Sequence, residues 1–223
     1  MSAKWNRRTL AAVIDHTLLK PEATSSQVRE VCSEARKLGF ASVCVNPCHV
    51  STAVHKLRDT PVKVCSVIGF PLGANRSIIK AAETLQAVSE GADEIDMVMA
   101  VGALKEKRHD QVEAEIRSVV EAAGHATVKV IIETCCLTDD EKVTACQLAA
   151  RAGAAFVKTS TGFGSAGATA ADVRLMRSTV GNALGVKASG GIRTLDQALE
   201  MLAAGATRLG TSAGVAILEE LRA

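Results

Sequence analysis

Short apolar segments alternate with longer segments of helical periodicity along all 223 residues, and this alternation limits the possible folds more than any other feature. Eight apolar segments have the length and composition of buried strands. They lie near Ala11–Asp15, Ser42–Val45, Val62–Ile68, Glu94–Val98, Thr127–Ile132, Ala155–Lys158, Val186–Ser189 and Thr207–Gly210. Strands joined by helices run parallel, because each helix returns the chain to the same end of the sheet.

The helical segments between the strands are marked at both ends. Several begin with the capping-box spacing, in which a Thr and a Gln or Glu three residues later satisfy free backbone amides. The three pairs are Thr24 with Gln27, Thr138 with Glu141, and Thr194 with Gln197. Glycines suited to the left-handed turn that ends a helix precede alternate strands. They are Gly39, Gly91, Gly153 and Gly205.

Eight strand–helix units without a linker predict an α/β protein, a (β/α)8 TIM barrel in a single domain over residues 1–223, with a short N-terminal helical extension. An open, doubly wound sheet is the competing fold, because periodicity alone does not separate the two. A hydrophobic fraction of 48% with only 2% aromatic residues suits helices packed tightly on a parallel sheet.

Charge and cysteine content narrow the class of function. A net charge of +2 gives no general basic field for nucleic acid, and aromatic stacking residues are scarce. No apolar run is long enough for a membrane span or a signal peptide. The seven cysteines include an adjacent pair but no CxxC spacing, so we expect reduced thiols in a cytoplasmic protein.

Polar residues interrupt the apolar strands at or near their predicted carboxyl ends. They are Asp15, Cys44, Asp96, Glu133, Lys158 and Lys187. In a barrel these ends meet at one mouth, where active sites of this fold lie. The sequence therefore predicts a site that combines these side chains.

Lys158 stands where the sixth strand ends, directly before a run of hydroxyl residues and glycines, and Lys187 lies on the next strand. Burial and a nearby like charge both disfavour the protonated form of a lysine. Together they can lower the pKa of a lysine from about 10.4 towards about 7 or 8, at which the amine is a nucleophile at neutral pH. The alternative is that one or both lysines point outward and pair with helix carboxylates.

Asp96 and Glu94 are two residues apart, so strand alternation places them on the same face. If Asp96 faces the two lysines, it is a counter-ion, a general acid/base or both. A purely structural ion pair is the alternative. Lys129, inside the fifth strand, faces either the lumen or the outer helices.

Two glycine-rich loops follow the last two strands, at Ser189–Arg193 and Gly210–Gly214. Glycines let backbone amides approach a ligand, and a helix that starts after such a loop favours an anion. Because barrels often bind phosphate at this position, the loops predict a phosphate site; as plain turns they would carry no function.

A second glycine pattern, Gly162, Gly164 and Gly167, fits GxGxxG, but about 20 residues later the chain has no acidic residue for a ribose. We therefore expect no nucleotide cofactor. The histidines have no metal-binding spacing, so we expect no metal, and we assign His16 and His49 to loops or the core.

Five segments, in order and spread over most of the chain, resemble the deoxyribose-phosphate aldolase family. They are IDHTLLKPEAT (residues 14–24), EIDMV (94–98), KVIIET (129–134), FVKTSTGF (156–163) and KASGGIRT (187–194). The resemblance implies a (β/α)8 barrel that reversibly cleaves 2-deoxy-D-ribose 5-phosphate to acetaldehyde and D-glyceraldehyde 3-phosphate. It implies no metal or organic cofactor, and we expect a homodimer or a higher homo-oligomer.

The resemblance also assigns roles. Lys158 would form the Schiff base, Lys187 would lower its pKa and assist proton transfer, and Asp96 would donate and accept protons. Lys129, Asp15, Thr17, Cys44 and Thr161 would support these residues. The phosphate would be bound by Gly162, Gly190, Gly191, Gly210 and Ser212.

One departure from the family is visible: some members have a C-terminal tyrosine that reaches the site, whereas this chain contains no tyrosine. Two other functions stay open. One is another lysine-dependent class I aldolase or transaldolase, which would use a donor other than acetaldehyde. The other is a non-catalytic sugar-phosphate-binding barrel, in which Lys158 would behave as an ordinary lysine.

Overall fold

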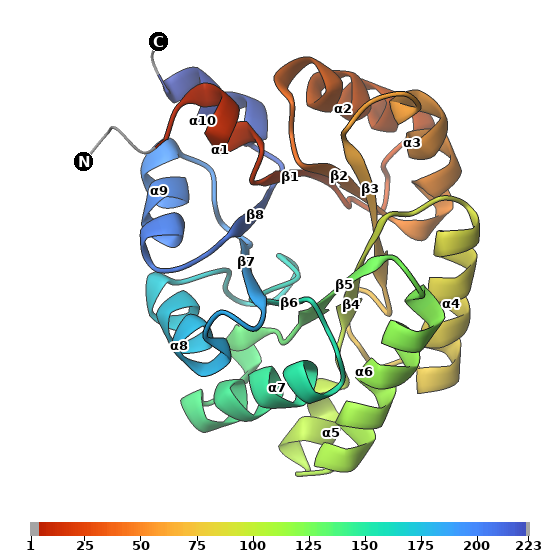
Figure 1. The fold of residues 1–223 in the computed structure, drawn as a ribbon, viewed down its shortest axis with the longest axis vertical. Coiled ribbons are helices and arrows are strands. Elements are labelled where there is room, and N and C mark those ends of the chain that lie inside the picture. Colours follow the sequence, from red (N-terminus) through yellow and green to blue (C-terminus); the bar gives the residue numbers. More distant parts are fainter. Residues whose placement is uncertain (1–4, 222–223) are drawn as a thin grey trace.

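The computed structural model describes residues 5–221, which form a closed barrel of parallel strands surrounded by helices (Figure 1). The strands are β1 (Ile14–Leu18), β2 (Ser42–Val45), β3 (Lys63–Ile68), β4 (Glu94–Val98), β5 (Thr127–Ile131), β6 (Phe156–Lys158), β7 (Gly185–Ser189) and β8 (Arg208–Thr211). They follow one another around the ring in sequence order, and β8 closes it by pairing with β1. The predicted barrel is confirmed, and the open sheet is excluded.

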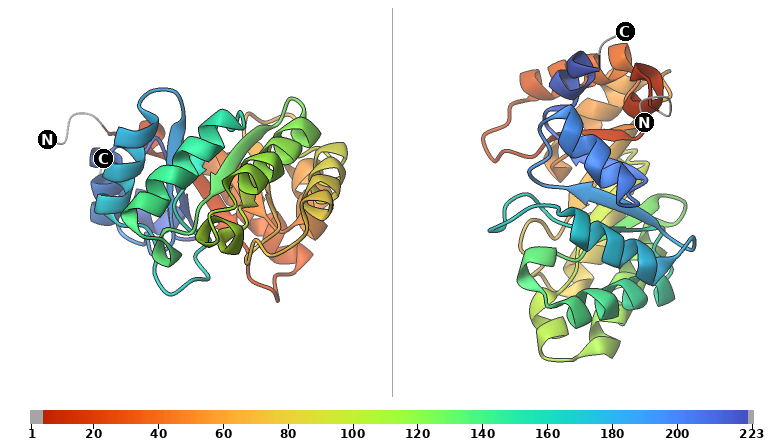
Figure 2. Two further views of the ribbon diagram at one scale, coloured as in Figure 1. Left: turned by 90° about the horizontal axis from the view of Figure 1, so that it is seen from below. Right: turned by 90° about the vertical axis from the view of Figure 1, so that its left-hand side faces the viewer.

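The helices form the outer layer, which two further views show wrapped around the strands (Figure 2). They are α1 (Arg7–Ala11), α2 (Ser25–Leu38), α3 (Val50–Leu57), α4 (Ser77–Ser89), α5 (Val101–Lys105), α6 (His109–Ala123), α7 (Asp139–Arg151), α8 (Ala170–Val180), α9 (Leu195–Ala203) and α10 (Gly214–Glu220). Short 3-10 turns, η2 (Pro47–His49) and η3 (Thr134–Cys136), follow β2 and β5. No helix within residues 5–221 is long and apolar enough to cross a membrane.

The predicted helix signals are present in the structure. All three Thr-initiated capping boxes form, at the starts of α2, α7 and α9. Gly39 ends α2 in the left-handed conformation with φ 72°, and Gly91, Gly153 and Gly205 also have positive φ angles after their helices. Local hydrogen bonding and glycine therefore set where these helices begin and end.

The first strand differs from its prediction. Residues Ala11–Asp15 were expected to form it, but β1 runs from Ile14 to Leu18. The preceding residues form α1, the predicted N-terminal helix, because Asn6 and Thr9 make a capping box and Leu10 and Ala11 are buried on its inner face. The shift places Asp15 second in its strand and not at the carboxyl end.

The apolar core lies between the strands and the helices, whereas the barrel lumen is mostly polar. Ile95 and Met97 of β4 are fully buried and pack in the main core. Glu94 and Asp96 alternate with them along the strand, and they contact lysines of other strands in the lumen. The packing of the outer helices thus holds the barrel together around a charged interior.

Candidate active site

Asp96, in the middle of β4, is the centre of a buried cluster of charges. Its Oδ2 accepts hydrogen bonds from Lys158 Nζ and Lys187 Nζ, each at 2.6 Å. Its Oδ1 accepts a hydrogen bond from Lys129 Nζ at 2.8 Å. Asp96, Lys129 and Lys187 are fully buried, and Lys158 is 3% exposed. All four point inward, so the outward alternatives for the lysines are excluded.

Strand register brings these residues together. Asp96 of β4 pairs with Lys129 of β5, and Lys158 of β6 pairs with Lys187 of β7. Residues in register on neighbouring parallel strands project from the same side of the sheet. Because the sheet is closed, the two pairs meet across the lumen.

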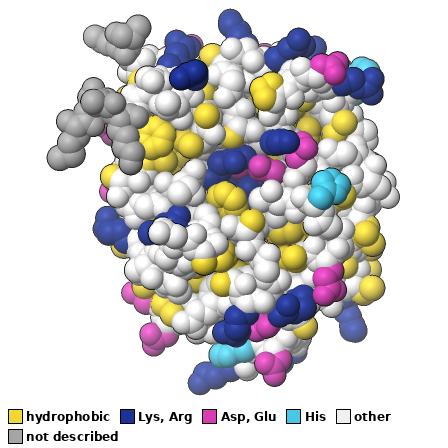
Figure 3. All heavy atoms as spheres, in the orientation of Figure 1, with side chains coloured by type: hydrophobic (Ala, Val, Ile, Leu, Met, Phe, Trp, Pro, Cys, Tyr) yellow, Lys and Arg dark blue, Asp and Glu magenta, His cyan; other side chains and the backbone are white. Residues whose placement is uncertain are grey.

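Each of the other three cations in the lumen contacts two carboxylates, whereas Lys158 contacts one, which it shares. The contacts are Lys129 with Glu94 and Asp96, Lys187 with Asp15 and Asp96, and Arg208 with Asp15 and Glu94, at N–O distances of 2.5–2.9 Å. Figure 3 shows basic and acidic side chains side by side near the middle of one face, over the ring of strands. Four cationic side chains therefore face three carboxylates in this cluster.

The contacts fix the charge of most of these groups. Burial would raise the pKa of Asp96, but the ammonium groups of Lys129, Lys158 and Lys187 outweigh it and hold this pKa well below its usual range. Burial would lower the pKa of Lys187, yet Asp15 and Asp96 raise it above the usual lysine value. Lys187 therefore stays protonated at neutral pH and is not a second neutral amine.

Asp15 and Glu133, both predicted at the mouth, lie elsewhere. Asp15 is below the mouth and joins the cluster through Lys187 and Arg208, with a further hydrogen bond from Ser42 Oγ at 2.7 Å. Glu133 lies beyond the end of β5, and within residues 5–221 it makes no ion pair with the lysines of the cluster. Its carboxylate accepts hydrogen bonds from the hydroxyl (2.5 Å) and the amide (3.2 Å) of Thr161. Glu133 therefore holds the loop after β6.

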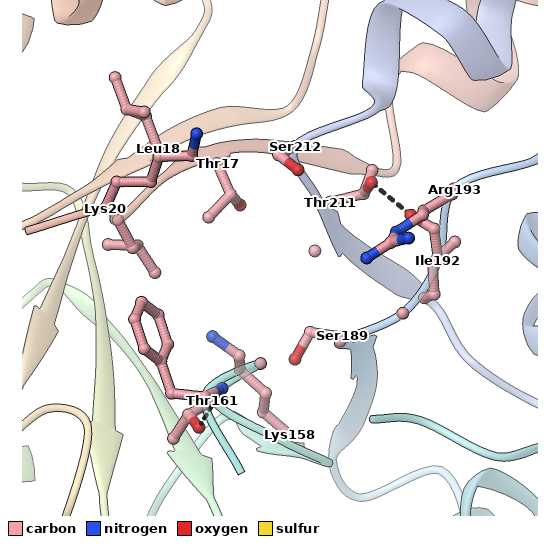
Figure 4. Close-up of a pocket in the computed structure, with 16 residues that line it drawn as sticks. Thr17, Leu18, Lys20, Lys158, Thr161, Ser189, Ile192, Arg193, Thr211 and Ser212 are labelled. Atoms are coloured by element: carbon pink, nitrogen blue, oxygen red, sulfur yellow. Dashed lines mark hydrogen bonds between the residues drawn. The ribbon is translucent and has the colours of Figure 1, made fainter. Parts of the chain in front are cut away.

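A pocket of about 240 Å³ opens above the charge cluster. Lys158, Thr161, Thr17 and Ser212 line it. Figure 4 shows the Lys158 amine and the Arg193 guanidinium pointing into the same space. The charge cluster is otherwise buried beneath this pocket, so a ligand would meet Lys158 first.

The predicted glycine loops form one wall of this pocket. Gly162, Gly190 and Gly191 line it with φ angles of 86°, 88° and 80°. Within residues 5–221, neither Gly190 nor Gly191 donates its amide hydrogen to another residue of the chain. Amides of this kind in a left-handed turn suit an anion. Gly210 also lines the pocket, and a Cβ there would lie 3.0 Å from Lys187 Cε.

The other glycines of the GxGxxG pattern have packing roles. A Cβ on Gly167 would lie 2.1 Å from the carbonyl oxygen of Gly190. A Cβ on Gly164 would lie 2.9 Å from Cys135 Sγ. Gly167 thus lets the loop after β6 pack closely on the loop after β7, and Gly164 lets it pack closely on Cys135 after β5.

The sequence predictions omitted three residues of the site. Arg193 is the last residue of the glycine-rich loop after the seventh strand, and the loop pattern by itself gives its side chain no role. Arg208 begins β8, and functional side chains in barrels were expected at the opposite strand ends. Cys65 sits inside an apolar strand and resembles core filling, yet its Sγ lies 3.2 Å from Asp96 Oδ1.

The remaining candidates lie outside the pocket. Cys44 is fully buried in β2, in register with Cys65. His16 is buried and contacts Glu34 Oε2 at 2.7 Å, and His49 contacts the carbonyl of Ala23 at 3.2 Å. Both histidines have structural partners, as expected for loop or core residues.

The fold is a closed parallel barrel, and a lysine amine lies in the pocket at its strand ends. These two features are typical of one class of protein, the barrel enzymes that use a lysine amine as a nucleophile. The chain belongs to one family of that class: residues 9–220 match the family described as "DeoC/LacD family aldolase". It is therefore an aldolase, a carbon–carbon lyase.

Named relatives agree with this assignment. The chain is 61% identical over 206 residues to deoxyribose-phosphate aldolase of Streptococcus sanguinis, which covers 92% of this chain and 94% of the relative. It is 60% identical over 211 residues to that of a Geobacillus species, covering 94% and 95%. The tetrameric deoxyribose phosphate aldolase of Aeropyrum pernix superposes with a TM-score of 0.89 at 37% identity, covering 94% of this chain and 89% of that one.

Proposed function

We propose that this aldolase reversibly cleaves 2-deoxy-D-ribose 5-phosphate to acetaldehyde and D-glyceraldehyde 3-phosphate, through a Schiff base on Lys158. The observation that carries the proposal is the position of Lys158 Nζ, at the base of the pocket and 2.6 Å from Asp96 Oδ2. Relatives that are 61% and 60% identical are named deoxyribose-phosphate aldolase, which supports this substrate.

Charge balance selects Lys158 as the amine that loses its proton. Lys129, Lys187 and Arg208 each neutralise two carboxylates, so deprotonating any of them would leave buried negative charge without a partner. Lys158 touches only Asp96. Its neutral form leaves three cations facing three carboxylates and frees an electron pair for attack.

The proposed chemistry then follows in steps that balance. The Lys158 amine adds to C1 of the open-chain sugar, and loss of water gives an iminium ion. The Asp96 carboxylate, directly or through water, accepts the proton of the C3 hydroxyl as the C2–C3 bond breaks. The bonding electrons enter the iminium to form an enamine, and D-glyceraldehyde 3-phosphate leaves. Protonation at C2 and addition of water then release acetaldehyde and restore Lys158.

We assign the phosphate to the wall formed by Gly162, Gly190, Gly191, Gly210 and Ser212. Arg193 adds a positive charge that points into the same space. A guanidinium with several free donors suits phosphate oxygens. This places the phosphate away from Lys158, as a five-carbon substrate with reacting C1 and phosphorylated C5 requires.

Borohydride reduction tests the Schiff base. With 2-deoxyribose 5-phosphate and then borohydride, we expect a stable secondary amine on the peptide that contains Lys158, identified by its mass. Lys187 and Lys129 are internal controls and should remain unmodified, because each is held by two carboxylates. Lys158→Met should give no adduct.

The same experiment separates the alternative functions. A sugar-phosphate-binding protein without catalysis would bind the substrate but leave no reduced adduct on Lys158. Another lysine-dependent aldolase would form an adduct with its own carbonyl donor but not with acetaldehyde. An adduct on any lysine other than Lys158 would contradict the proposed mechanism.

We also propose that the chain acts as a homo-oligomer in the cytoplasm. All seven cysteines lie within the described residues and are free thiols, which suits a reducing compartment. One apolar surface, the α4 patch, consists of Leu72, Ile78, Ile79 and Leu85, each more than half exposed. Ile78 and Leu85 are seven residues apart and share one face of α4.

A second copy of the chain is the partner that we assign to the α4 patch. Exposed apolar surface of this kind marks an interface, and homo-oligomers bury such surface against the same patch of another copy. The Aeropyrum pernix relative is tetrameric. We expect Leu85→Glu to lower the oligomeric mass in analytical ultracentrifugation, and Ser33→Glu on the exposed face of α2 to leave it unchanged. A monomeric wild-type chain would contradict the proposal.

A further inference from the structure

Two thiols and a carboxylate lie together beneath the pocket. The ligand atoms of Cys44, Cys65 and Asp96 are all within 4.8 Å of one another, and the three residues are buried. The two cysteines are direct neighbours in the register of β2 and β3. Cys65 Sγ lies 3.2 Å from Asp96 Oδ1. The described residues contain no other group of three potential metal ligands this close together.

A cation already faces these atoms. Lys129 Nζ lies 2.8 Å from Asp96 Oδ1 and 3.5 Å from Cys65 Sγ. The local geometry thus suits positive charge. A divalent cation that displaces two thiol protons would leave the net charge of the lumen unchanged.

We propose that Cys44, Cys65 and Asp96 form a binding site for a soft divalent cation of the Zn²⁺ class. Paired thiolates select such ions over Mg²⁺ or Ca²⁺. With Zn–S bonds of about 2.3 Å, tetrahedral coordination places two sulfurs about 3.8 Å apart. The observed separations require only small side-chain movements to reach this arrangement. Three protein ligands leave a fourth position for water.

Occupancy of this site would inhibit the aldolase. A metal on Asp96 Oδ1 displaces the Lys129 ammonium and withdraws the carboxylate that is 2.6 Å from Lys158 Nζ. This consequence rests on the proposed role of Asp96 in catalysis, whereas the binding of the metal does not. Inhibition should be reversed by a chelator.

The test uses the full chain with three other thiols replaced. Cys48 and Cys136 are exposed and Cys135 is half-buried, so they could bind metal by themselves. In the background Cys48→Ser, Cys135→Ser and Cys136→Ser, we expect one Cd²⁺ per chain in equilibrium dialysis, with the ultraviolet charge-transfer absorbance of Cd–thiolate bonds. These measurements need no substrate, so their outcome is independent of the aldolase activity.

Substitution of the ligands locates the site. Changes near a metal ligand already cost about 10- to 100-fold in affinity, so Cys44→Ser and Cys65→Ser should each weaken Cd²⁺ binding at least tenfold. The matched control is Cys146→Ser, a buried thiol of α7 in the main core. It should bind Cd²⁺ as the background does. Circular dichroism checks that each variant is folded.

Cadmium X-ray absorption of the background protein tests the site without any change at Cys44 or Cys65. Two sulfur ligands are expected; none would overturn the proposal. It would also be overturned by the absence of bound Cd²⁺, or by unchanged affinity in Cys44→Ser and Cys65→Ser. Zn²⁺ should lower the aldolase rate and EDTA should restore it. A full rate in the metal-loaded protein would overturn the inhibitory role alone.

Discussion

Lys187 is the residue through which the charge balance of the lumen acts on the proposed nucleophile, Lys158. It is fully buried, and it neutralises Asp15 and Asp96 at the same time. Both carboxylates raise the pKa of Lys187, against the effect of burial, so its charge is retained throughout the working pH range. Its ammonium group therefore stays charged beside Asp96 Oδ2, the same oxygen that Lys158 contacts.

The change Lys187→Met should move the activity optimum to higher pH and lower turnover by at least tenfold. Without Lys187, the remaining Lys158, Lys129 and Arg208 balance the three carboxylates, so a neutral Lys158 would leave buried negative charge without a partner. The pH profile of kcat/KM measures this shift. As a control, Lys142→Met removes a cation that is paired with Asp172 outside the lumen, and its profile should match the wild type. A wild-type profile for Lys187→Met would remove Lys187 from this role.

Sequence patterns located some site residues and missed others for physical reasons. Lys158, Lys187 and Asp96 were predicted because a charged residue inside an apolar strand is costly unless it has a partner. Arg208 was missed because its two carboxylates come from strands far apart in the sequence, and no local pattern reports that contact. Cys65 was missed because a cysteine inside an apolar strand is usually a core residue, and only the structure shows that it contacts Asp96.

At the scale of elements, the loops after β6 and β7 act as one unit. Thr159 Oγ1 donates to the carbonyl of Ser189 at 3.1 Å, and Ser189 Oγ donates to the carbonyl of Ser160 at 2.6 Å. Gly167 lies against Gly190, which leaves no room for a side chain. The proposed phosphate wall therefore depends on the close approach of two loops.

The substitution Gly167→Ala should spread these loops, because its Cβ would lie 2.1 Å from the carbonyl oxygen of Gly190. We expect the free energy of unfolding to fall by about 1–3 kcal/mol, the usual cost of overpacking. The KM for the phosphorylated substrate should rise at the same time. Denaturant unfolding and steady-state kinetics measure the two effects.

Gly102→Ala is the matched control for this substitution. Gly102 lies in α5 with no atom within 4 Å of a Cβ, so alanine there should be neutral or add about 0.5–1 kcal/mol to the free energy of unfolding. Equal effects of the two substitutions would show that the contact between the loops carries no energy.

Element positions could be predicted where the signals are local. β2 and β4 begin and end at the predicted residues, because capping residues, glycines and short apolar runs mark them. β1 could not be placed correctly, since the apolar run before it is shared by a helix and a strand. Barrel closure itself depends on the pairing of β1 with β8, which only the count of strands indicated.

At the scale of the whole molecule, the charged lumen makes stability depend on pH. Lys187 and Arg208 lower the pKa of Asp15 despite its burial, and the surrounding lysines hold that of Asp96 well below its usual range. In the unfolded chain both aspartates would have a pKa of about 3.9. Their contribution to stability is therefore complete above this value and is lost as the pH falls towards the folded-state pKa values. Lys129 and Lys187, whose pKa values are raised, add no slope on the acid side.

We expect the free energy of unfolding to fall steeply below about pH 4, by up to about 1.4 kcal/mol per pH unit for each of the two carboxylates. Denaturant midpoints measured at pH 7, 5, 4 and 3 give this slope. Asp96→Asn should reduce this slope by the contribution of one carboxylate. Asp110→Asn, at an exposed position, should leave the slope as in the wild type. A wild-type slope in Asp96→Asn would mean that the buried carboxylate takes up its proton equally in the folded and unfolded chain, and the ion pairs of the lumen would then not stabilise the barrel.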